Sequence, residues 1–282
     1  MAKFGIVMFA TDYSIQPAAL ARACEERGFE SLFFPEHTHI PASRKTPYPG
    51  GGELPKEYSH THDPFVALAA AGAVTRNLKL GTGVCLVVER DPITLAKEVA
   101  TLDFITGGRL LFGIGGGWNI EEMQNNGVAE PKRRWKLVKE KILAMREIWS
   151  KENAQFHGEF VNFDPIWSYP KPAQPGGPPV LMGSQSARAI ERTADYCDGW
   201  LPINNPRVDF AQKVKELREA EQRRGRENLS LSLFGGPSKE EHVANFIKLG
   251  FERFLYWVPP APADTVLPLL DRHAQLAARF SS

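Results

Sequence analysis

One histidine with a carboxylate beside it directly follows a short apolar run. Ser31 to Pro35 reads as a buried strand, and Glu36-His37 comes next in the chain. Histidine titrates near neutral pH, so His37 at the end of a strand could donate or accept a proton during catalysis. The alternative is that His37 forms only a hydrogen bond to a loop, and the residues here leave both interpretations open.

Glycines gather in or after three further apolar runs. Gly81-Thr82-Gly83-Val84-Cys85 interrupts a strand-like run, as at a bulge or where a ligand approaches the backbone closely. Gly115-Gly116-Gly117-Trp118 exposes main-chain amides against which a flat ring or a phosphate could rest. It is not a Walker loop, because no Gly-Lys-Ser/Thr follows.

The third glycine segment is Met182-Gly183-Ser184-Gln185-Ser186. We expect a helix to begin near Ser186, with Arg188 in its first turn. Amides at a helix start, hydroxyl groups and a nearby arginine together indicate a phosphate site. A simple N-cap formed by Ser186 is the alternative.

The sequence gives little support for a catalytic metal site or for a catalytic nucleophile. His37-x-His39 and His60-x-His62-Asp63 have the spacing of metal ligands, but a catalytic metal needs further ligands from other strand ends. The other runs end in Gly115, Gly183, Pro202, Gly235 and Val258. No Gly-x-Ser-x-Gly motif is present, and no cysteine has an evident histidine partner. Strand ends rich in glycine and poor in charge favour a large bound cofactor that carries the chemistry.

The elements that must position these residues alternate between strands and helices. Continuous apolar runs are typical of parallel strands buried on both faces. There are eight, at 4–9, 31–35, 78–88, 109–114, 179–182, 200–203, 229–234 and 254–258. Between them, Asp91-Pro92 begins a helix that ends near Thr106, and the spacing of five residues predicts a buried helix face. These five are Trp135, Val138, Ile142, Met145 and Trp149.

This alternation predicts an α/β fold, a (β/α)₈ TIM barrel with its site at the carboxyl ends of the strands. A doubly wound sheet is the alternative, but the first strand is not followed by Gly-x-Gly-x-x-Gly. We expect a single domain over residues 1–282 with three long segments: the loop 38–63, the segment 120–131, and an insertion at 151–178 with a strand-like stretch at 156–163. Connections of that length are usually functional lids or mobile.

Composition excludes several classes of protein. Among the 282 residues, 34 Lys and Arg against 33 Asp and Glu leave a net charge of +1, which argues against nucleic-acid binding. No apolar stretch reaches the ~18 residues that a membrane span requires. Three cysteines without a Cys-x-x-Cys pair indicate neither a disulfide framework nor a zinc site. We expect a cytoplasmic protein.

The motifs together resemble the bacterial luciferase-like superfamily, and more narrowly its deazaflavin-dependent oxidoreductases, which use coenzyme F420. The resemblance spans nearly the whole chain and keeps the order of the motifs. They are Phe33-Phe34-Pro35-Glu36-His37, Leu80-Gly81-Thr82-Gly83-Val84, Arg90-Asp91-Pro92, the run from Gly107 to Trp118, Gly158-Glu159-Phe160, Pro170-Lys171-Pro172 and Asp198-Gly199-Trp200.

The resemblance implies a barrel with an insertion, a homodimer, and a flavin or deazaflavin at the strand carboxyl ends. It implies a non-proline cis peptide at Gly83-Val84 behind the cofactor, His37 near the reactive ring face, and Glu36 in contact with the cofactor. The implied catalytic residues are His37 and Glu36, without a metal. The cofactor-binding residues are Glu36, Thr82, Gly83, Val84, Cys85, Gly115, Gly116, Gly117, Trp118, Met182, Gly183, Ser184, Gln185 and Ser186.

The resemblance leaves the cofactor open between two choices. We expect hydride transfer between F420 and an organic substrate. The alternative is a monooxygenase that uses reduced flavin mononucleotide (FMN) and oxygen, in which the loop 38–63 excludes water. Many deazaflavin members carry Asp before the histidine, whereas Glu36-His37 has the Glu that is also common in FMN members. A non-catalytic flavin-binding protein and a metal-dependent hydrolase are the remaining alternatives.

Overall fold

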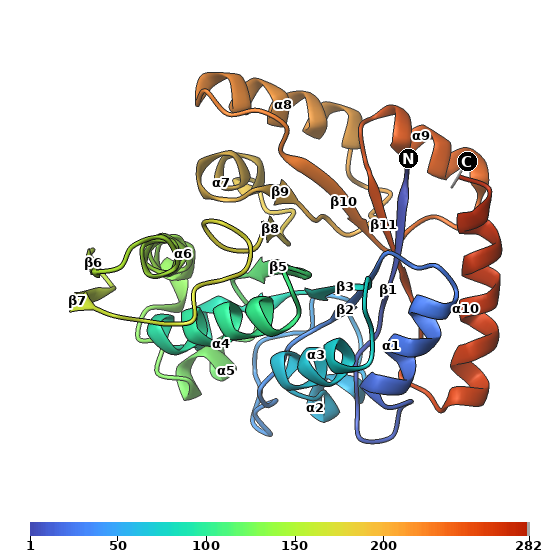
Figure 1. Cartoon of the computed structure of the whole chain (residues 1–282), viewed down its shortest axis with the longest axis horizontal. Helices are drawn as coiled ribbons and strands as arrows, with labels where there is room; N and C mark the ends of the chain where they lie inside the picture. The colour runs from blue at the N-terminus through green and yellow to red at the C-terminus, as the bar shows by residue number, and fades with distance from the viewer. Residues whose placement is uncertain (281–282) are drawn as a thin grey trace.

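The computed structural model describes residues 1–280, and its strands form a closed parallel barrel. The barrel strands are β1 (Lys3–Val7), β2 (Ser31–Phe34), β3 (Lys79–Thr82), β4 (Cys85–Leu86), β5 (Leu110–Gly115), β8 (Val180–Met182), β9 (Gly199–Trp200), β10 (Ser230–Phe234) and β11 (Arg253–Trp257). β1 pairs with both β2 and β11, and the pairing of β3 with β5 closes the ring. The predicted TIM barrel is confirmed (Figure 1).

One predicted strand is divided. The run 78–88 forms β3 and β4, which both pair with β5 and are separated by a cis peptide bond between Gly83 and Val84. This is the position at which the resemblance implied a cis peptide.

β5 packs closely against the end of β3 at Gly113. A side chain at Gly113 has no room, since its Cβ would lie 2.1 Å from the carbonyl oxygen of Thr82.

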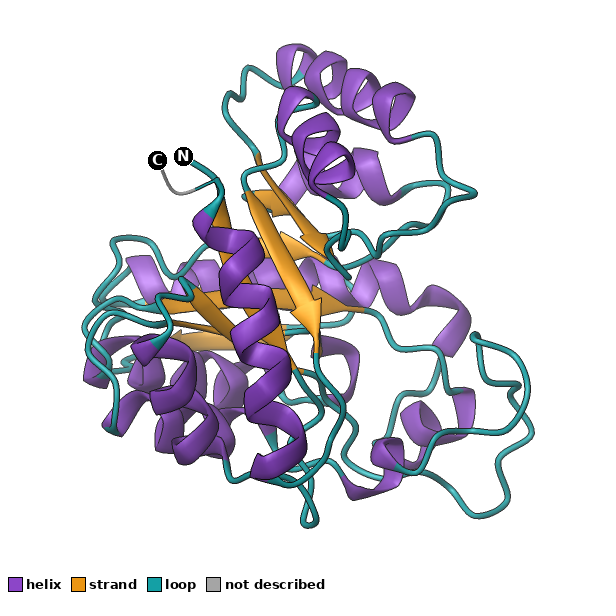
Figure 2. Ribbon diagram, turned by 90° about the vertical axis from the view of Figure 1, so that its right-hand side faces the viewer, coloured by secondary structure: helices purple, strands orange, loops and turns teal. Residues whose placement is uncertain are grey.

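Helices surround the strands (Figure 2). They are α1 (Pro17–Glu26), α3 (Pro64–Ala73), α4 (Pro92–Ile105), α6 (Arg134–Ser150), α7 (Ala189–Tyr196), α8 (Phe210–Arg223), α9 (Glu240–Lys248) and α10 (Ala263–Ala278). α4 begins as predicted, with Pro92 in its first turn and the Asp91 carboxylate accepting the Thr94 N–H at 2.8 Å. No helix among residues 1–280 is both long and apolar enough to cross a membrane.

The core has two layers. Inside the barrel, Val7, Phe33, Leu111, Leu181, Leu201, Phe234 and Leu255 form one cluster, while a larger one fills the space between strands and helices. The predicted buried face of α6 is confirmed for Val138, Ile142, Met145 and Trp149. Trp135 is an exception, because it lies in the first turn of α6, is half-buried and faces a cavity.

The long segments contain short elements of their own. The loop 38–63 carries α2 (Glu57–His60), and α5 (Ile120–Asn125) opens the segment 120–131. The strand-like stretch expected at 156–163 is wrong as one strand: the insertion forms an antiparallel hairpin of β6 (Ala154–His157) and β7 (Asn162–Ile166). The chain reverses because the Gly158 N–H bonds the Val161 carbonyl across the turn. The hairpin lies beside α6 (Figure 1).

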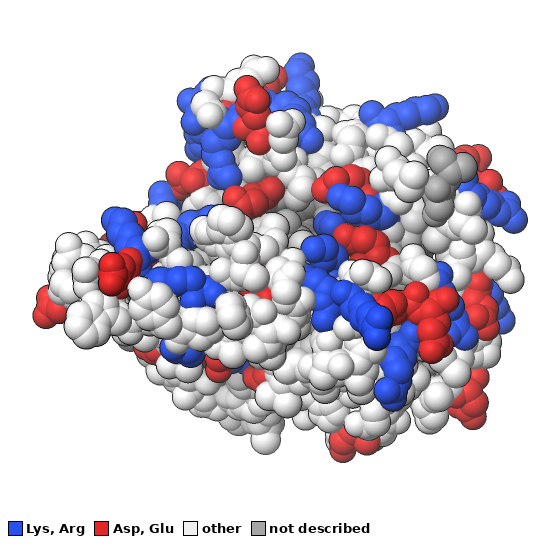
Figure 3. Space-filling model, in the orientation of Figure 1, with Lys and Arg blue, Asp and Glu red and all other residues white. Residues whose placement is uncertain are grey.

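Charged side chains of both signs are interspersed on the surface. Lysine and arginine alternate with aspartate and glutamate over the face in Figure 3. Many of them form exposed ion pairs, such as Arg223 with Glu191 and Lys139 with Asp195. Exposed pairs of this kind contribute little to stability.

Candidate active site

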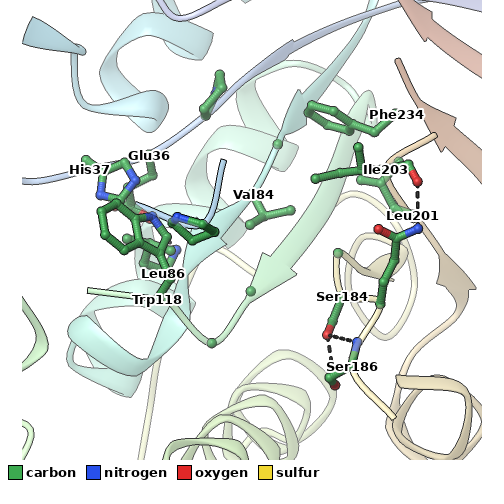
Figure 4. A pocket seen from close by; sticks show the side chains of 18 of the residues that line it. Glu36, His37, Val84, Leu86, Trp118, Ser184, Ser186, Leu201, Ile203 and Phe234 are labelled. Atoms are coloured by element: carbon green, nitrogen blue, oxygen red, sulfur yellow. Dashed lines mark hydrogen bonds between the residues drawn. The ribbon is translucent and has the colours of Figure 1, made fainter. Parts of the chain in front are cut away.

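A cavity of about 540 Å³ opens at the carboxyl ends of the barrel strands. Its size lies within the range of small-molecule and cofactor sites. Residues from almost every strand end line it: Phe9, Pro35, Glu36, His37, Pro49, Tyr58, Gly83, Val84, Leu86, Gly115, Gly116, Gly117, Trp118, Arg134, Trp135, Gly183, Ser184, Gln185, Ser186, Leu201, Ile203, Phe234 and Trp257. In Figure 4, Val84 lies between the His37 and Trp118 side and the Ser184 and Ser186 side.

Val84 and the glycines around it form a wall that tolerates no added atoms. A Cβ on Gly183 would lie 2.3 Å from Val84 Cγ1, and one on Gly115 would lie 2.6 Å from Val84 Cγ2. A Cβ on Gly116 would lie 3.1 Å from the Trp135 ring. The absence of side chains at these three positions leaves main chain facing the cavity, which is the surface that a flat ring requires.

The Glu36 carboxylate is hydrogen-bonded to groups of the protein itself. Its Oε2 accepts the N–H of Leu86 at 2.5 Å, and its Oε1 accepts from Arg90 Nε at 2.6 Å and lies 2.5 Å from Arg90 Nη2. Arg90 also pairs with Asp63 at 2.5 Å and with Glu98 at 2.9 Å. Glu36 therefore anchors the strand that follows the bulge at Gly83-Val84, and its oxygens point to Leu86 and Arg90.

His37 is held by a second carboxylate, from α5. His37 Nδ1 lies 2.8 Å from Glu122 Oε2, and both side chains are buried. Since a carboxylate only accepts hydrogen bonds, Nδ1 is the donor and Nε2 is the ring nitrogen left for a ligand. The imidazole also packs near Tyr58 and against the edge of Trp118, with ring centroids at 5.1 and 5.8 Å. A histidine oriented by a buried carboxylate is an arrangement suited to proton transfer.

The sequence alone gave Glu122 no role, and its segment 120–131 was expected as a long connection. The available signal was its position, because α5 follows the strand end at Gly115 and should lie at the same rim of the barrel. The side-chain amide oxygen of Asn119 caps α5 by accepting the Glu122 N–H at 3.3 Å. This cap begins the helix at the point where Glu122 can reach His37.

Polar groups gather at the opposite side of the cavity. Ser184 Oγ accepts the N–H of Ser186 at 3.2 Å, and Arg192 Nη1 donates to Ser186 Oγ at 2.8 Å. Arg134 lines the cavity, and its Nε is buried without a hydrogen-bond partner in the described chain. Arg192 packs over Trp135 at 4.4 Å from the ring centroid. Hydroxyls, a bonded arginine and an unsatisfied arginine N–H suit a bound anion.

The predicted start of the helix at Ser186 is wrong. α7 begins at Ala189, because residues 186–188 form a turn in which the Ala189 N–H donates to the Ser186 carbonyl at 2.8 Å. Arg188 is an exposed residue before the helix and does not lie in its first turn.

Three predicted cofactor-binding residues do not line the cavity. Thr82 Oγ1 donates to the Gly113 carbonyl at 2.7 Å, and Cys85 and Met182 are buried in the core outside the barrel. Alternate strand residues point to opposite faces, so Val84 and Leu86 face the cavity while Cys85 points away. Burial raises the pKa of the Cys85 thiol.

The histidines with metal-like spacing have separate partners. His39 lies 3.0 Å from Thr38 Oγ1 and from Asn125 Nδ2, while His60 Nδ1 lies 2.9 Å from Asp12. Among residues 1–280, no group of three or more His, Cys, Asp and Glu side chains is arranged to hold a metal ion.

Several known proteins are similar to this chain in sequence or in fold. Residues 16–264 match the family model of the luciferase-like monooxygenases. An uncharacterized protein of Mycobacterium tuberculosis is 40% identical over 286 residues, which cover 99% of this chain and 98% of that one. The F420-dependent glucose-6-phosphate dehydrogenase of Nakamurella multipartita is 29% identical, over 74% of this chain and 58% of that one. The crystal structure of a monooxygenase from Streptomyces bottropensis superposes with a TM-score of 0.79 at 20% identity, over 99% of this chain and 100% of that one. This chain belongs to the luciferase-like monooxygenase family, whose members are oxidoreductases.

Proposed function

We propose that this protein is an F420-dependent oxidoreductase that transfers a hydride between the deazaflavin and a small organic substrate. The observation that carries the proposal is the His37–Glu122 pair facing a cavity with a glycine-lined wall. The relative from Nakamurella multipartita, which is named as F420-dependent, supports the choice of cofactor.

The residues present fit such a cofactor. Val84 would lie against the ring, together with the main chain of Gly115, Gly116 and Gly183. An added side chain at any of these glycines would meet Val84 or Trp135, so the wall stays bare there. Ser184, Ser186 and the unsatisfied Nε of Arg134 would face the phosphate. When bound, F420 supplies or accepts the hydride, as two electrons at once.

His37 handles the proton that accompanies the hydride. Glu122 fixes Nδ1 as the donor to its carboxylate, so Nε2 faces the ligand. In a reduction, Nε2 donates a proton to the substrate oxygen while hydride reaches the neighbouring carbon, and His37 is left neutral. In the oxidation, the same nitrogen accepts the proton from the hydroxyl group. General acid–base catalysis of this kind contributes about 10²- to 10⁴-fold to a rate.

Aromatic side chains line one part of the cavity. Phe9 packs against Tyr58 at 4.8 Å and against Trp257 at 6.0 Å between ring centroids, and Tyr58 belongs to the loop 38–63. These rings give the substrate compartment an apolar wall, which suits an organic substrate.

A redox assay tests the proposal. Reduced F420 is mixed with the protein and a panel of aldehydes, ketones and enones, and the absorbance of oxidised F420 is followed. We expect turnover that falls by at least 100-fold in His37→Asn, with little change in F420 binding. Turnover only with reduced FMN and oxygen would instead support the monooxygenase alternative. If His37→Asn leaves turnover unchanged, the assigned role of His37 is wrong.

We also propose that a second copy of the chain covers the outer face of α3 and α4. α3 has no polar side chain in Pro64–Ala73, and Val66, Phe104 and Ile105 are 71%, 57% and 63% exposed. A helix that is apolar all round is normally buried, and a two-fold dimer buries the same patch on both copies. We expect a dimer by light scattering, which Phe104→Glu converts to a monomer and the exposed control Glu227→Gln does not. A monomeric wild type would refute this.

The three cysteines are reduced and buried, which suits the cytoplasm, where we propose that the protein resides.

A further inference from the structure

A buried carboxyl group that the proposed reaction does not use lies directly behind the glycine loop. Glu89 ends the 3₁₀ helix Val87–Glu89 and is 9% exposed. A Cβ on Gly117, which lines the cavity, would lie 3.4 Å from Glu89 Oε1. Asn126 Nδ2 donates to Glu89 Oε2 at 3.0 Å, but Oε1 is buried and has no hydrogen-bond partner within residues 1–280.

Glu122 has the same unbalanced pattern. Its Oε2 holds His37 Nδ1, whereas its Oε1 is buried without a partner in the described part of the chain. Asn126 connects the two acids, because its Nδ2 also donates to the Glu122 main-chain carbonyl at 3.1 Å. Two buried acceptor oxygens without donors are costly, and a proton on Glu89 would remove one of the two buried charges.

The two cations near Glu89, Arg90 and Lys141, are bonded to other groups. Arg90 follows Glu89 in the chain but is bound to Glu36, Asp63 and Glu98. Lys141 Nζ donates to the main-chain carbonyls of Val88 and Arg90, at 2.9 and 2.6 Å. Burial, and then the charges of Glu122 and Glu36, raise the pKa of Glu89 to about 9, against the opposing effects of Asn126 and Arg90.

We propose that Glu89 is a positioning residue that carries a proton and so adds no second negative charge beside the carboxylate of Glu122, to which Asn126 connects it. The Glu122 oxygen that bonds His37 Nδ1 then keeps His37 in one orientation and one tautomer. Glu89 touches neither cofactor nor substrate in this scheme, and it acts only through Glu122. The catalytic use of His37 rests on the proposed function, but the proton on Glu89 does not.

The first test needs no variant and no cofactor. Infrared spectra of the apoprotein should contain the carbonyl band of a protonated carboxylic acid at pH 7, and this band should disappear as the pH is raised past about 9. At pH 7, Glu89→Gln should lack the band, while Glu227→Gln, a matched exposed control, should retain it. Absence of the band in the wild type at pH 7 would overturn the proposal.

The second test follows His37 itself. In the nitrogen NMR spectrum of the histidine-labelled apoprotein, the His37 ring signals should show an inflection near pH 9, where Glu89 loses its proton. In Glu89→Gln the amide takes the place of the protonated acid, so the neutral-pH signals should stay unchanged and the inflection should vanish. Persistence of the inflection in this variant would contradict the coupling. Because both readouts use the apoprotein, a failure of F420 binding would leave them interpretable.

Discussion

Replacing Arg90 by methionine should destabilise the protein far more than replacing an exposed arginine. The side chain of Glu36 is 1% exposed, and Arg90 supplies its only countercharge among its hydrogen-bond partners. In Arg90→Met, the carboxylate keeps the Leu86 N–H and the Cys85 thiol as hydrogen-bond donors but loses the positive charge of Arg90. Removing one partner of a buried ion pair costs about 3–5 kcal/mol, because the other charge stays buried and unpaired.

The other partners of Arg90 add little to this loss. Asp63 and Glu98 have side chains that are 41% and 36% exposed, so water replaces the guanidinium. Exposed pairs contribute about 0–1 kcal/mol each. We therefore expect a loss of about 3–7 kcal/mol in the free energy of unfolding, most of it from Glu36.

Urea unfolding at pH 7 measures this loss, and a double variant assigns it. Glu36→Gln removes the charge but keeps an acceptor for the Leu86 N–H, so Arg90→Met with Glu36→Gln should recover about 2–3 kcal/mol relative to Arg90→Met alone. Arg223→Met, in which an exposed pair with Glu191 is lost, is the matched control and should cost under about 1 kcal/mol. Equal losses for Arg90→Met and Arg223→Met, or no recovery in the double variant, would refute the reasoning.

Three further predictions concern the site. The pKa of Glu89 is about 9 in the folded protein and near its ordinary value of 4.5 in the unfolded chain. Between these pH values, the free energy of unfolding of the wild type should therefore fall relative to that of Glu89→Gln, by up to about 1.4 kcal/mol per pH unit. Equal pH slopes of the two proteins in urea unfolding would contradict this. Gly183→Ala places a Cβ 2.3 Å from Val84 Cγ1 and should weaken F420 binding at least tenfold by fluorescence titration, whereas unchanged affinity would remove Val84 from the ring site. Glu122→Gln should lower kcat at least tenfold while KM changes little, because the substrate still binds and His37 loses its orienting charge; a change in KM alone would not fit.

The strands of the barrel were predictable because each one is buried on both faces and reads as a continuous apolar run. Gly83, which interrupts the apolar run 78–88, also indicated that this run would not form one continuous strand. Positions beyond strand ends were harder to predict. Ser186 looked like a helix start, but the turn at 186–188 delays α7 to Ala189. Serine followed by polar residues fits both a cap and a turn, and only packing decides between them.

The candidate site was predictable in its location but not in its internal contacts. His37, Val84, the three glycines 115–117 and the turn 183–186 do line one cavity. The partners of Glu36 and His37 come from residues 50 to 85 positions away in the chain, and sequence spacing gives no sign of them. Cys85 was expected to bind the cofactor but points into the core, while its neighbours Val84 and Leu86 face the cavity. Which residues face inward around the bulge depends on the backbone geometry there, and the sequence does not show that geometry.

The most direct test of the F420 assignment is an equilibrium titration of the purified apoprotein with F420 and, separately, with FMN, followed by ligand fluorescence. We predict saturable binding of F420 at least tenfold tighter than that of FMN, and weakened in Gly183→Ala. Tighter binding of FMN, or no saturable binding of either cofactor, would contradict the assignment of this cavity to a deazaflavin.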